Sequence, residues 1–540
     1  MINRIGVEER NINSVYSTQS NNKDLRNPSF RSAGLLPVLM QGIQACERNP
    51  MVNVAVIDMF SAILPRTFVE SLTNWFAGFE AFRRESSGLI VNCLIPSFIT
   101  LGIAKIAQKF IMPNGTNMAS CWADSNMLEK VSKVYESSNA KDKVHDTLKT
   151  ILENIEGIEG KDEVKFKDVL NTEEIEKYSQ RLKELTTKDL SNKEFKKEIE
   201  KLTDEIVGKT QVFENIKVNG GSNPVKATNV ETLLSDMVKF FKEYGKTEGI
   251  SISEFANKSK KLVRSKSLVG LAVVLPLAAS MQYINRWITE KVSGVKGAPI
   301  YDDFGKENSN ATQNNRAKEG LLKQKFISIS SMIGVGLLSM MKMPSMNMLE
   351  FKGIFPTMDQ ARIISTTTFA SRMAAADDKN ELAEATVRDI ATFLSLYFLG
   401  DYAAKGAATV IEKKTGVKLL NDTKPIEEDA NIFKKAWHWF KDVNIKSSKE
   451  VISKIQNEYK AKNKIVDEAQ LKKLTQKAEL YRGACQATNL GVSLALLGLI
   501  IPFFLRKNTE KRHAEDIRLS QQVSSSSAEM TDVKQSVKKS

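Results

Sequence analysis

Three long runs of uncharged residues constrain this chain more than any other feature. They cover residues 86–104, 267–285 and 483–505 and contain 19, 19 and 23 residues. About 20 residues of α-helix cross the hydrocarbon core of a bilayer, so each run is long enough for a membrane span. Shorter uncharged segments, which could be further spans, re-entrant segments or core helices, lie at 32–46, 326–341 and 390–400.

Each of the three long runs contains a proline that follows two apolar residues. These prolines are Pro96, Pro276 and Pro502. Proline inside a soluble helix costs about 3 kcal/mol, whereas membrane helices tolerate it because the freed carbonyl groups find other partners. The pattern therefore favours spans with helix kinks at these three positions. We expect Pro276 to lie within a span rather than at the end of a helix.

The composition requires that any membrane part be joined to substantial polar regions. The chain is 42% hydrophobic and 26% charged, with a mean hydropathy of −0.27, values that are ordinary for a soluble protein. Alternating patterns of strand length are nearly absent, so an all-α fold is predicted. The predicted organisation is a disordered segment (1–31), an apolar helical membrane block (32–112), a soluble Lys/Glu-rich helical insertion (125–262), a second apolar block (263–411), an amphipathic polar region (412–482), a transmembrane helix (483–505) and a disordered basic tail (506–540).

Charged residues that interrupt apolar segments are the candidate functional residues. They are Asp58, Arg388, Asp389, Asp401 and Lys405. Asp401 and Lys405 are four positions apart, so on a helix they share a face and could form an ion pair. Charges inside a span mark a path for an ion or a substrate. The alternative is that these helices are half-exposed and the charges face water.

Aromatic residues near the ends of these segments are candidate anchors at a membrane interface. They are Trp287, which follows the second long run, and Phe433, Trp437 and Phe440, which share one face of a predicted helix with lysines elsewhere on it. Packing of this helix against another protein helix explains the second group equally well.

The sequence contains no recognisable catalytic or cofactor-binding motif. Its three histidines and four cysteines fall in no zinc, H-E-x-x-H or C-x-x-C spacing, and no phosphate-binding glycine loop is present. We expect no enzymatic activity, no metal and no cofactor. Nucleic-acid binding is not expected either, although the net charge is +14, because no helix-turn-helix or RNP-like pattern occurs.

The predicted function is therefore that of a non-enzymatic, multi-pass integral membrane protein. It would either transport a small solute or ion, or organise partners at the membrane. Its expected partners are the lipid bilayer and, through the helical insertion, other proteins. The polar N-terminus lacks an apolar signal segment, so no cleavable signal peptide is expected. The alternative is a soluble or peripheral all-α interaction or scaffold protein whose apolar runs are core helices.

Overall fold

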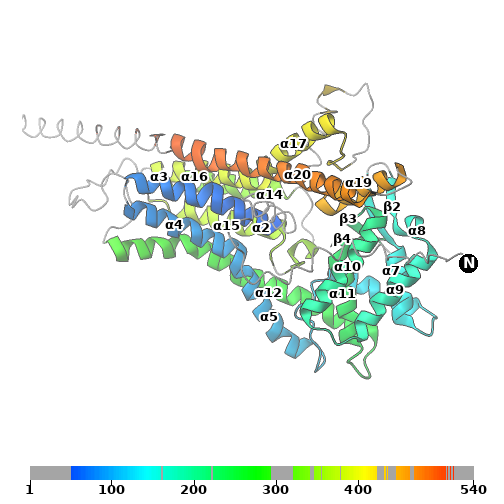
Figure 1. The fold of residues 1–540 in the computed structure, drawn as a ribbon. Helices are drawn as coiled ribbons and strands as arrows, with labels where there is room; N and C mark the ends of the chain where they lie inside the picture. Colours follow the sequence, from blue (N-terminus) through cyan, green and yellow to red (C-terminus); the bar gives the residue numbers. More distant parts are fainter. Residues whose placement is uncertain are drawn as a thin grey trace, which may run out of the picture.

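The computed structural model describes residues 50–293, 320–340, 346–421, 445–462 and 467–505, except for 74, 160–161, 221–222, 354 and 378. It also describes isolated positions at 431, 432, 434, 435, 507, 508, 511, 515 and 518. These residues form a bundle of long helices at one end and a mixed α/β part at the other (Figure 1). The described chain is predominantly helical, which confirms the predicted fold class at that level.

The bundle is built from helices that in four cases pass through a π-helical turn. Its segments are α2 (Pro50–Ile57), η2 (Asp58–Ile63), α3 (Leu64–Thr73), α4 (Trp75–Leu89), η3 (Ile90–Leu94), α5 (Ile95–Ile111), α12 (Ile252–Ser293), α14 (Leu321–Ser339), the 3₁₀ turn η4 (Met346–Leu349), α15 (Met358–Ala375), α16 (Lys379–Leu394), η5 (Ser395–Leu399), α17 (Gly400–Thr415), α20 (Glu468–Ser493) and η6 (Leu494–Ile500).

Five of these continuous helices are long and apolar enough to cross a membrane: Met51–Leu72, Gly78–Ile111, Ile252–Val292, Leu321–Ser339 and Glu468–Leu505. Three of them contain the three long runs, and the fourth overlaps the shorter run at 326–341. The first helix was not predicted as a span, because charges divide it. The segment 390–400 forms the junction of α16, η5 and α17, and 32–46 lies outside the described residues.

Three π-helical turns are each followed two residues later by a proline. The prolines are Pro65 after η2, Pro96 after η3 and Pro502 after η6. Proline has no N–H and cannot close the usual i→i−4 bond, so the turn before it must be arranged differently. A π turn, in which bonds run from i to i+5, is one such arrangement. Pro276, by contrast, lies inside α12 as predicted, with helix on both sides.

The α/β part corresponds to the predicted insertion, but it contains a sheet as well as helices. Its elements are α6 (Ser125–Ser137), α7 (Lys143–Glu153), β1 (Ile155–Glu159), β2 (Asp162–Lys165), α8 (Phe166–Val169), α9 (Thr172–Thr187), α10 (Asn192–Thr210), β3 (Glu214–Val218), β4 (Val225–Asn229) and α11 (Val230–Tyr244). The four strands are antiparallel in the order β2-β1-β3-β4, with Gly157 opposite Ile216 and Ile216 opposite Ala227.

The sequence pattern did not predict these strands because each is only four or five residues long. In β3 the side chains of Ile216 and Val218 are buried while those between and beside them are more exposed, an alternation too short to distinguish from a helical pattern. The helices here carry clear start signals. Asn171 with Glu174 and Ser191 with Glu194 form capping boxes at the starts of α9 and α10.

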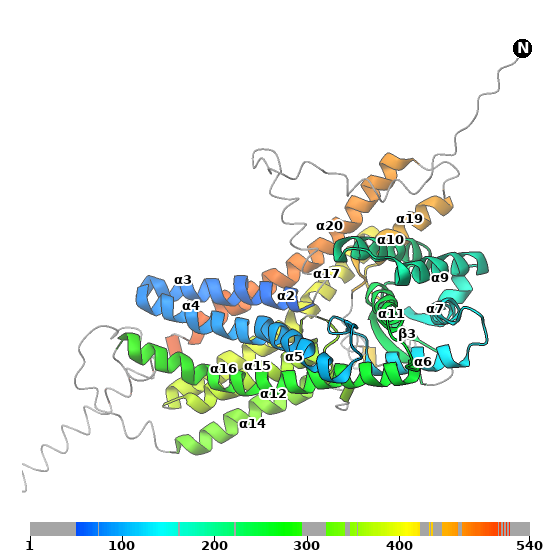
Figure 2. The same cartoon turned by 90° about the horizontal axis from the view of Figure 1, so that it is seen from below.

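Two segments connect the α/β part firmly to the rest of the chain. Helix α12 starts in its core, where Phe255 and Leu262 are buried, and continues without a break into the bundle (Figure 2). Helix α19 (Ser448–Lys462) lies against α10. The Glu450 carboxylate there accepts hydrogen bonds from the backbone N–H groups of Phe213 and Glu214 at 2.9 and 3.1 Å. The α/β part thus includes a helix from the predicted 412–482 region.

Two carboxyl groups in the α/β part are expected to change stability with pH in opposite directions. Burial raises the pKa of Asp236, although Lys239 and the Trp122 N–H oppose this shift. The ionised Asp236 side chain therefore destabilises the fold as the pH rises above its unfolded pKa. We expect Asp236→Asn to raise the melting temperature at pH 7 by roughly 2–4 °C, with the gain vanishing near pH 4, as measured by tryptophan fluorescence of the purified chain.

Glu129 supplies the matched control for this pH experiment. Hydrogen bonds from Lys133 and Lys260 hold the pKa of Glu129 at about 2. Its stabilising effect is present above the unfolded pKa and disappears as the pH falls toward 2. Glu129→Gln should therefore lower the melting temperature at pH 7. A lower melting temperature of Asp236→Asn at pH 7 would show that the ionised Asp236 carboxyl group does not destabilise the fold.

Close packing between η6 and the first helix depends on Gly498. A Cβ atom there would lie 2.8 Å from the Ser61 carbonyl oxygen and 3.0 Å from Pro65 Cβ. Gly498→Val must push the helices apart, so we expect it to cost about 1–3 kcal/mol and lower the melting temperature. Gly491→Ala is the control, since nothing lies within 4 Å of a Cβ at that position. Equal effects of both changes would show that the contact is unimportant.

Candidate functional site

A cavity lies between four helical segments of the bundle and is lined by charged and polar side chains. Its walls come from α2 through α3, α4 with η3, α15, and α16 with η5. Three of the four walls contain a π-helical turn, and such turns often occur at functional sites. The free space inside has room for about two water molecules. Its contents would therefore be small.

The π turn η2 allows the first helix to present one continuous stripe of residues to this cavity. Val54, Asp58, Ala62 and Arg66, each four positions from the next, all line it. In a straight α-helix a spacing of four drifts by about 40° at each step. A π turn contains more residues per turn and removes much of this drift. Asp58 begins η2 and Arg66 follows in α3, and both residues line the cavity.

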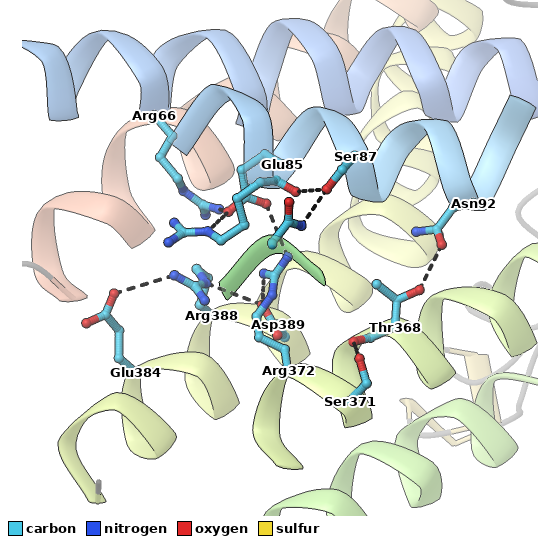
Figure 3. A network of polar contacts seen from close by, with 12 residues as sticks. Arg66, Glu85, Ser87, Asn92, Thr368, Ser371, Arg372, Glu384, Arg388 and Asp389 are labelled. Carbon is cyan, nitrogen blue, oxygen red and sulfur yellow. Dashed lines mark hydrogen bonds and ion pairs between the residues drawn. The ribbon is translucent and has the colours of Figure 1, made fainter. Parts of the chain in front are cut away.

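Arginine and carboxylate side chains from four helices form an ion-pair network along the cavity (Figure 3). Arg66 Nη1 lies 2.7 Å from Glu85 Oε1, which joins α3 to α4. Arg372 of α15 reaches both Glu85, at 3.5 Å, and Asp389 of α16, at 2.8 Å. Arg388 contacts Asp389 at 3.3 Å. The side chain of Asp389 is only 1% exposed, so these charges are buried and depend on one another.

Several polar atoms in this network have no hydrogen-bond partner within the described chain. They include Asp389 Oδ2, Arg372 Nε and Arg66 Nη2. Asp58 also lines the cavity, and no hydrogen bond or ion pair joins it to another described residue. Buried polar groups are normally satisfied by protein, water or a bound species. The cavity therefore offers both donors and acceptors to water or to a small ion.

A second polar cluster lies on the next helices, toward the α/β part. Asp401 of α17 accepts a hydrogen bond from Asn489 Nδ2 of α20 at 3.2 Å. Gln486, one turn earlier on α20, donates to the side-chain oxygen of Asn53. Lys405 is buried one turn after Asp401. The hydrogen-bond partner of Asp401 is Asn489; the spacing allowed a pair with Lys405, and the alternative placed both charges in water.

The structure brings three of the five predicted charged residues together. Asp58, Arg388 and Asp389 lie at or beside the cavity, whereas Asp401 and Lys405 belong to the second cluster. The predicted anchor Trp287 is 60% exposed on α12, and the other three predicted anchors lie outside the described residues or have undescribed side chains: Phe433, Trp437 and Phe440.

Sequence reasoning missed the other cavity residues, including Arg66, Glu85 and Arg372. They stand at the ends of apolar segments or within a polar helix, where charges are common. The four-residue spacing from Val54 to Arg66 was the one available signal for the first of them.

The outer surface of the bundle is apolar, and its interior holds the charged network within an apolar core. Large apolar side chains that point outward on the long helices include Phe60, Phe98, Phe110, Val273, Phe326, Leu338 and Phe503. Soluble proteins rarely expose apolar surface on this scale. The bundle thus has the polarity expected of helices surrounded by lipid.

Along α12 this apolar surface ends at one basic residue on each side, Lys266 and Arg286, which we call its two charged layers. At one level Lys266 is buried beneath Trp122, and at the other Arg286 pairs with Asp377 and Glu381. Lys266 and Arg286 are twenty positions apart, about 30 Å along the helix axis. This separation equals the thickness of a bilayer hydrocarbon core. The uncharged run at 267–285 fills the interval between the two layers.

Comparison with known protein families, with curated proteins and with solved structures finds no match for this chain. The geometry of the bundle and its cavity is therefore the basis for assigning a function.

Proposed function

We propose that this chain is a multi-pass integral membrane protein that carries a small ion or polar solute through the charged cavity of its helical bundle. The observation that carries the proposal is a set of buried charges inside a bundle whose outer surface is apolar. The Arg66–Glu85 ion pair joins two of the five apolar helices and lies inside beside Asp58, and apolar side chains such as Phe98 and Phe326 point outward. Charges within a span normally face a bundle interior or a water-filled cavity and mark a path for ions.

The size and lining of the cavity support a small cargo. Its free space admits about two water molecules, and both signs of charge face it, through Arg66, Arg372, Asp58 and Glu85. π-helical turns in its walls widen the helices at the same level, as interrupted helices do around transporter sites. A soluble interaction protein, the alternative, would have to keep the apolar outer surface covered by partners.

Membrane integration is tested by washing cell membranes with alkaline carbonate. We expect the full-length chain to stay in the membrane pellet, because five apolar helices would each need to leave the bilayer. Complete release into the supernatant would overturn the proposal.

Transport is tested with the purified chain in vesicles of phosphatidylcholine and phosphatidylglycerol. Currents are recorded on a solid-supported membrane after jumps in Na⁺, K⁺, Cl⁻ or H⁺. We expect a current with at least one of these ions, and we expect Asp389→Asn to reduce it at least tenfold. Glu290→Gln, an exposed carboxyl at the end of α12, is the control and should leave the current unchanged. Absence of current with every ion would overturn the transport proposal.

A further inference from the structure

Asp58 is an unusual carboxyl group because it stands inside an apolar helix and faces the cavity. It lies in the span Met51–Leu72, and no hydrogen bond or ion pair joins it to another described residue. Glu85, Arg66 and Arg372 lie close enough to act on it electrostatically from α4, α3 and α15. A carboxyl group with free oxygen atoms can accept and release a proton without breaking a structural bond.

A pair of hydroxyl groups lies on the opposite wall of the same cavity. Tyr397 of η5 and Ser365 of α15 are both buried, and their oxygen atoms are 2.9 Å apart, so that either can donate to the other. Asp58 and Cys93 line the same cavity as the two hydroxyl groups. The guanidinium of Arg362 lies 5.7 Å from the Tyr397 ring centre. The hydroxyl pair therefore lines the cavity, and Arg362 lies beside the Tyr397 ring.

Arg362 lies near both this hydroxyl pair and Asp401. Asp401 follows Tyr397 by four positions along the helix, and both Arg362 and Arg482 act on its carboxyl group electrostatically. Tyr402 and Asn489 are its other polar neighbours. Arg482 in turn donates to the Lys446 carbonyl oxygen at 3.0 Å, beside the α/β part. A line of polar groups thus runs from the charged end of the bundle toward its other end.

We propose that the ion carried is a proton and that Asp58, Tyr397 and Asp401 relay it along this line. This proposal rests on the transport function proposed above. A proton that enters as hydronium protonates the Asp58 carboxylate and leaves neutral water in the cavity. The Asp58 proton passes to the Tyr397 oxygen as the Tyr397 and Ser365 hydroxyls release one proton onward through water to Asp401. Asp401 gives it to water near Arg482, and Asp58 is again ionised. One proton crosses, and rotation of the two hydroxyl groups restores the starting direction of their hydrogen bond, which either oxygen can donate.

The geometry favours a proton over a metal cation. The space in the cavity holds about two water molecules, and a hydroxyl pair can pass a proton but not a larger ion. Within the residues described, no group of three His, Cys, Asp or Glu side chains is placed to hold a metal ion.

The test uses the full-length chain in vesicles of phosphatidylcholine and phosphatidylglycerol that contain a pH-sensitive dye. A potassium gradient with valinomycin drives proton entry. We expect dye acidification above that of empty vesicles, and we expect Asp58→Asn, Tyr397→Phe and Asp401→Asn each to slow it at least tenfold. Tyr397→Phe keeps the buried ring, so it tests the relay even where a carboxyl variant fails to fold. Glu290→Gln is the control and should keep the full rate.

The outcomes separate this proposal from the transport proposal. Proton entry that Tyr397→Phe leaves unchanged would overturn the relay. A current carried by Na⁺, K⁺ or Cl⁻ without proton entry would overturn the proton assignment and leave the transport proposal standing. Absence of movement of any of these ions would overturn both.

Discussion

Replacing Arg372 with methionine is expected to lower the free energy of unfolding by about 3–5 kcal/mol, because the change removes a cationic partner that two buried carboxylates share. Arg372 lies 2.8 Å from Asp389 and 3.5 Å from Glu85, and its side chain is almost fully buried. Methionine fills much of the same volume, so loss of packing contributes little. Thermal and denaturant unfolding of the detergent-solubilised chain would measure the loss.

The double variant Arg372→Met with Asp389→Leu isolates the charge effect. Removing both partners leaves Arg388 in contact with Glu384 and Glu85 in contact with Arg66. We therefore expect the double variant to be more stable than the sum of the single losses predicts, by more than about 1 kcal/mol. Asp377→Asn is the control, since its carboxyl group is 61% exposed and pairs with Arg286 at the surface. Small and additive losses would show that the network is hydrated.

The second large effect is expected for Lys266, which joins the bundle to the α/β part. Its Nζ atom donates to the Cys121 carbonyl oxygen at 2.6 Å and lies 3.8 Å from the Trp122 ring centre. Lys266→Met removes this charged bond and leaves a buried carbonyl without its donor, at a cost of about 2–4 kcal/mol. Residues 112–124 should then open more often, and chymotrypsin should cut beside Trp122 at least tenfold faster.

Lys258→Met is the matched control for this experiment. Lys258 lies two turns earlier on the same helix, and its partner is Glu254 at the surface. This variant should keep the normal melting temperature and cleavage rate. Equal cleavage of the Lys266 and Lys258 variants would mean that other contacts hold the segment 112–124 in place.

The sequence revealed the helical class and most of the long apolar helices because their signal is local. Runs such as 267–285 need only composition and length to be recognised. The helix Met51–Leu72 was not recognised as a span because Asp58, Arg66 and Glu70 interrupt it. Their suitability for a span depends on neighbouring helices, and a single sequence does not reveal that arrangement.

Only some residues of the candidate site could be predicted, because the sequence shows local interruptions of apolar segments but not contacts between distant helices. Asp58 and Asp389 stand out because each interrupts an apolar segment. Glu85 and Arg372 look like ordinary charges at the ends of helices until the fold places them 3.5 Å apart, although 287 positions separate them. The short strands of the α/β part were missed because pairing such as that of Gly157 with Ile216 is defined by distant residues.

The two charged layers of α12 fix a length that the surrounding lipid would have to match. A lysine or arginine at the end of a span usually adjusts to bilayer thickness by extending its flexible side chain. Lys266 is held by Cys121 and Trp122, and Arg286 is held by Asp377 and Glu381, so neither can extend freely. In a thicker or thinner membrane the bilayer itself would deform around the protein, at a cost for each ångström of mismatch. Such a chain would sort to membranes whose hydrocarbon core is about 30 Å thick.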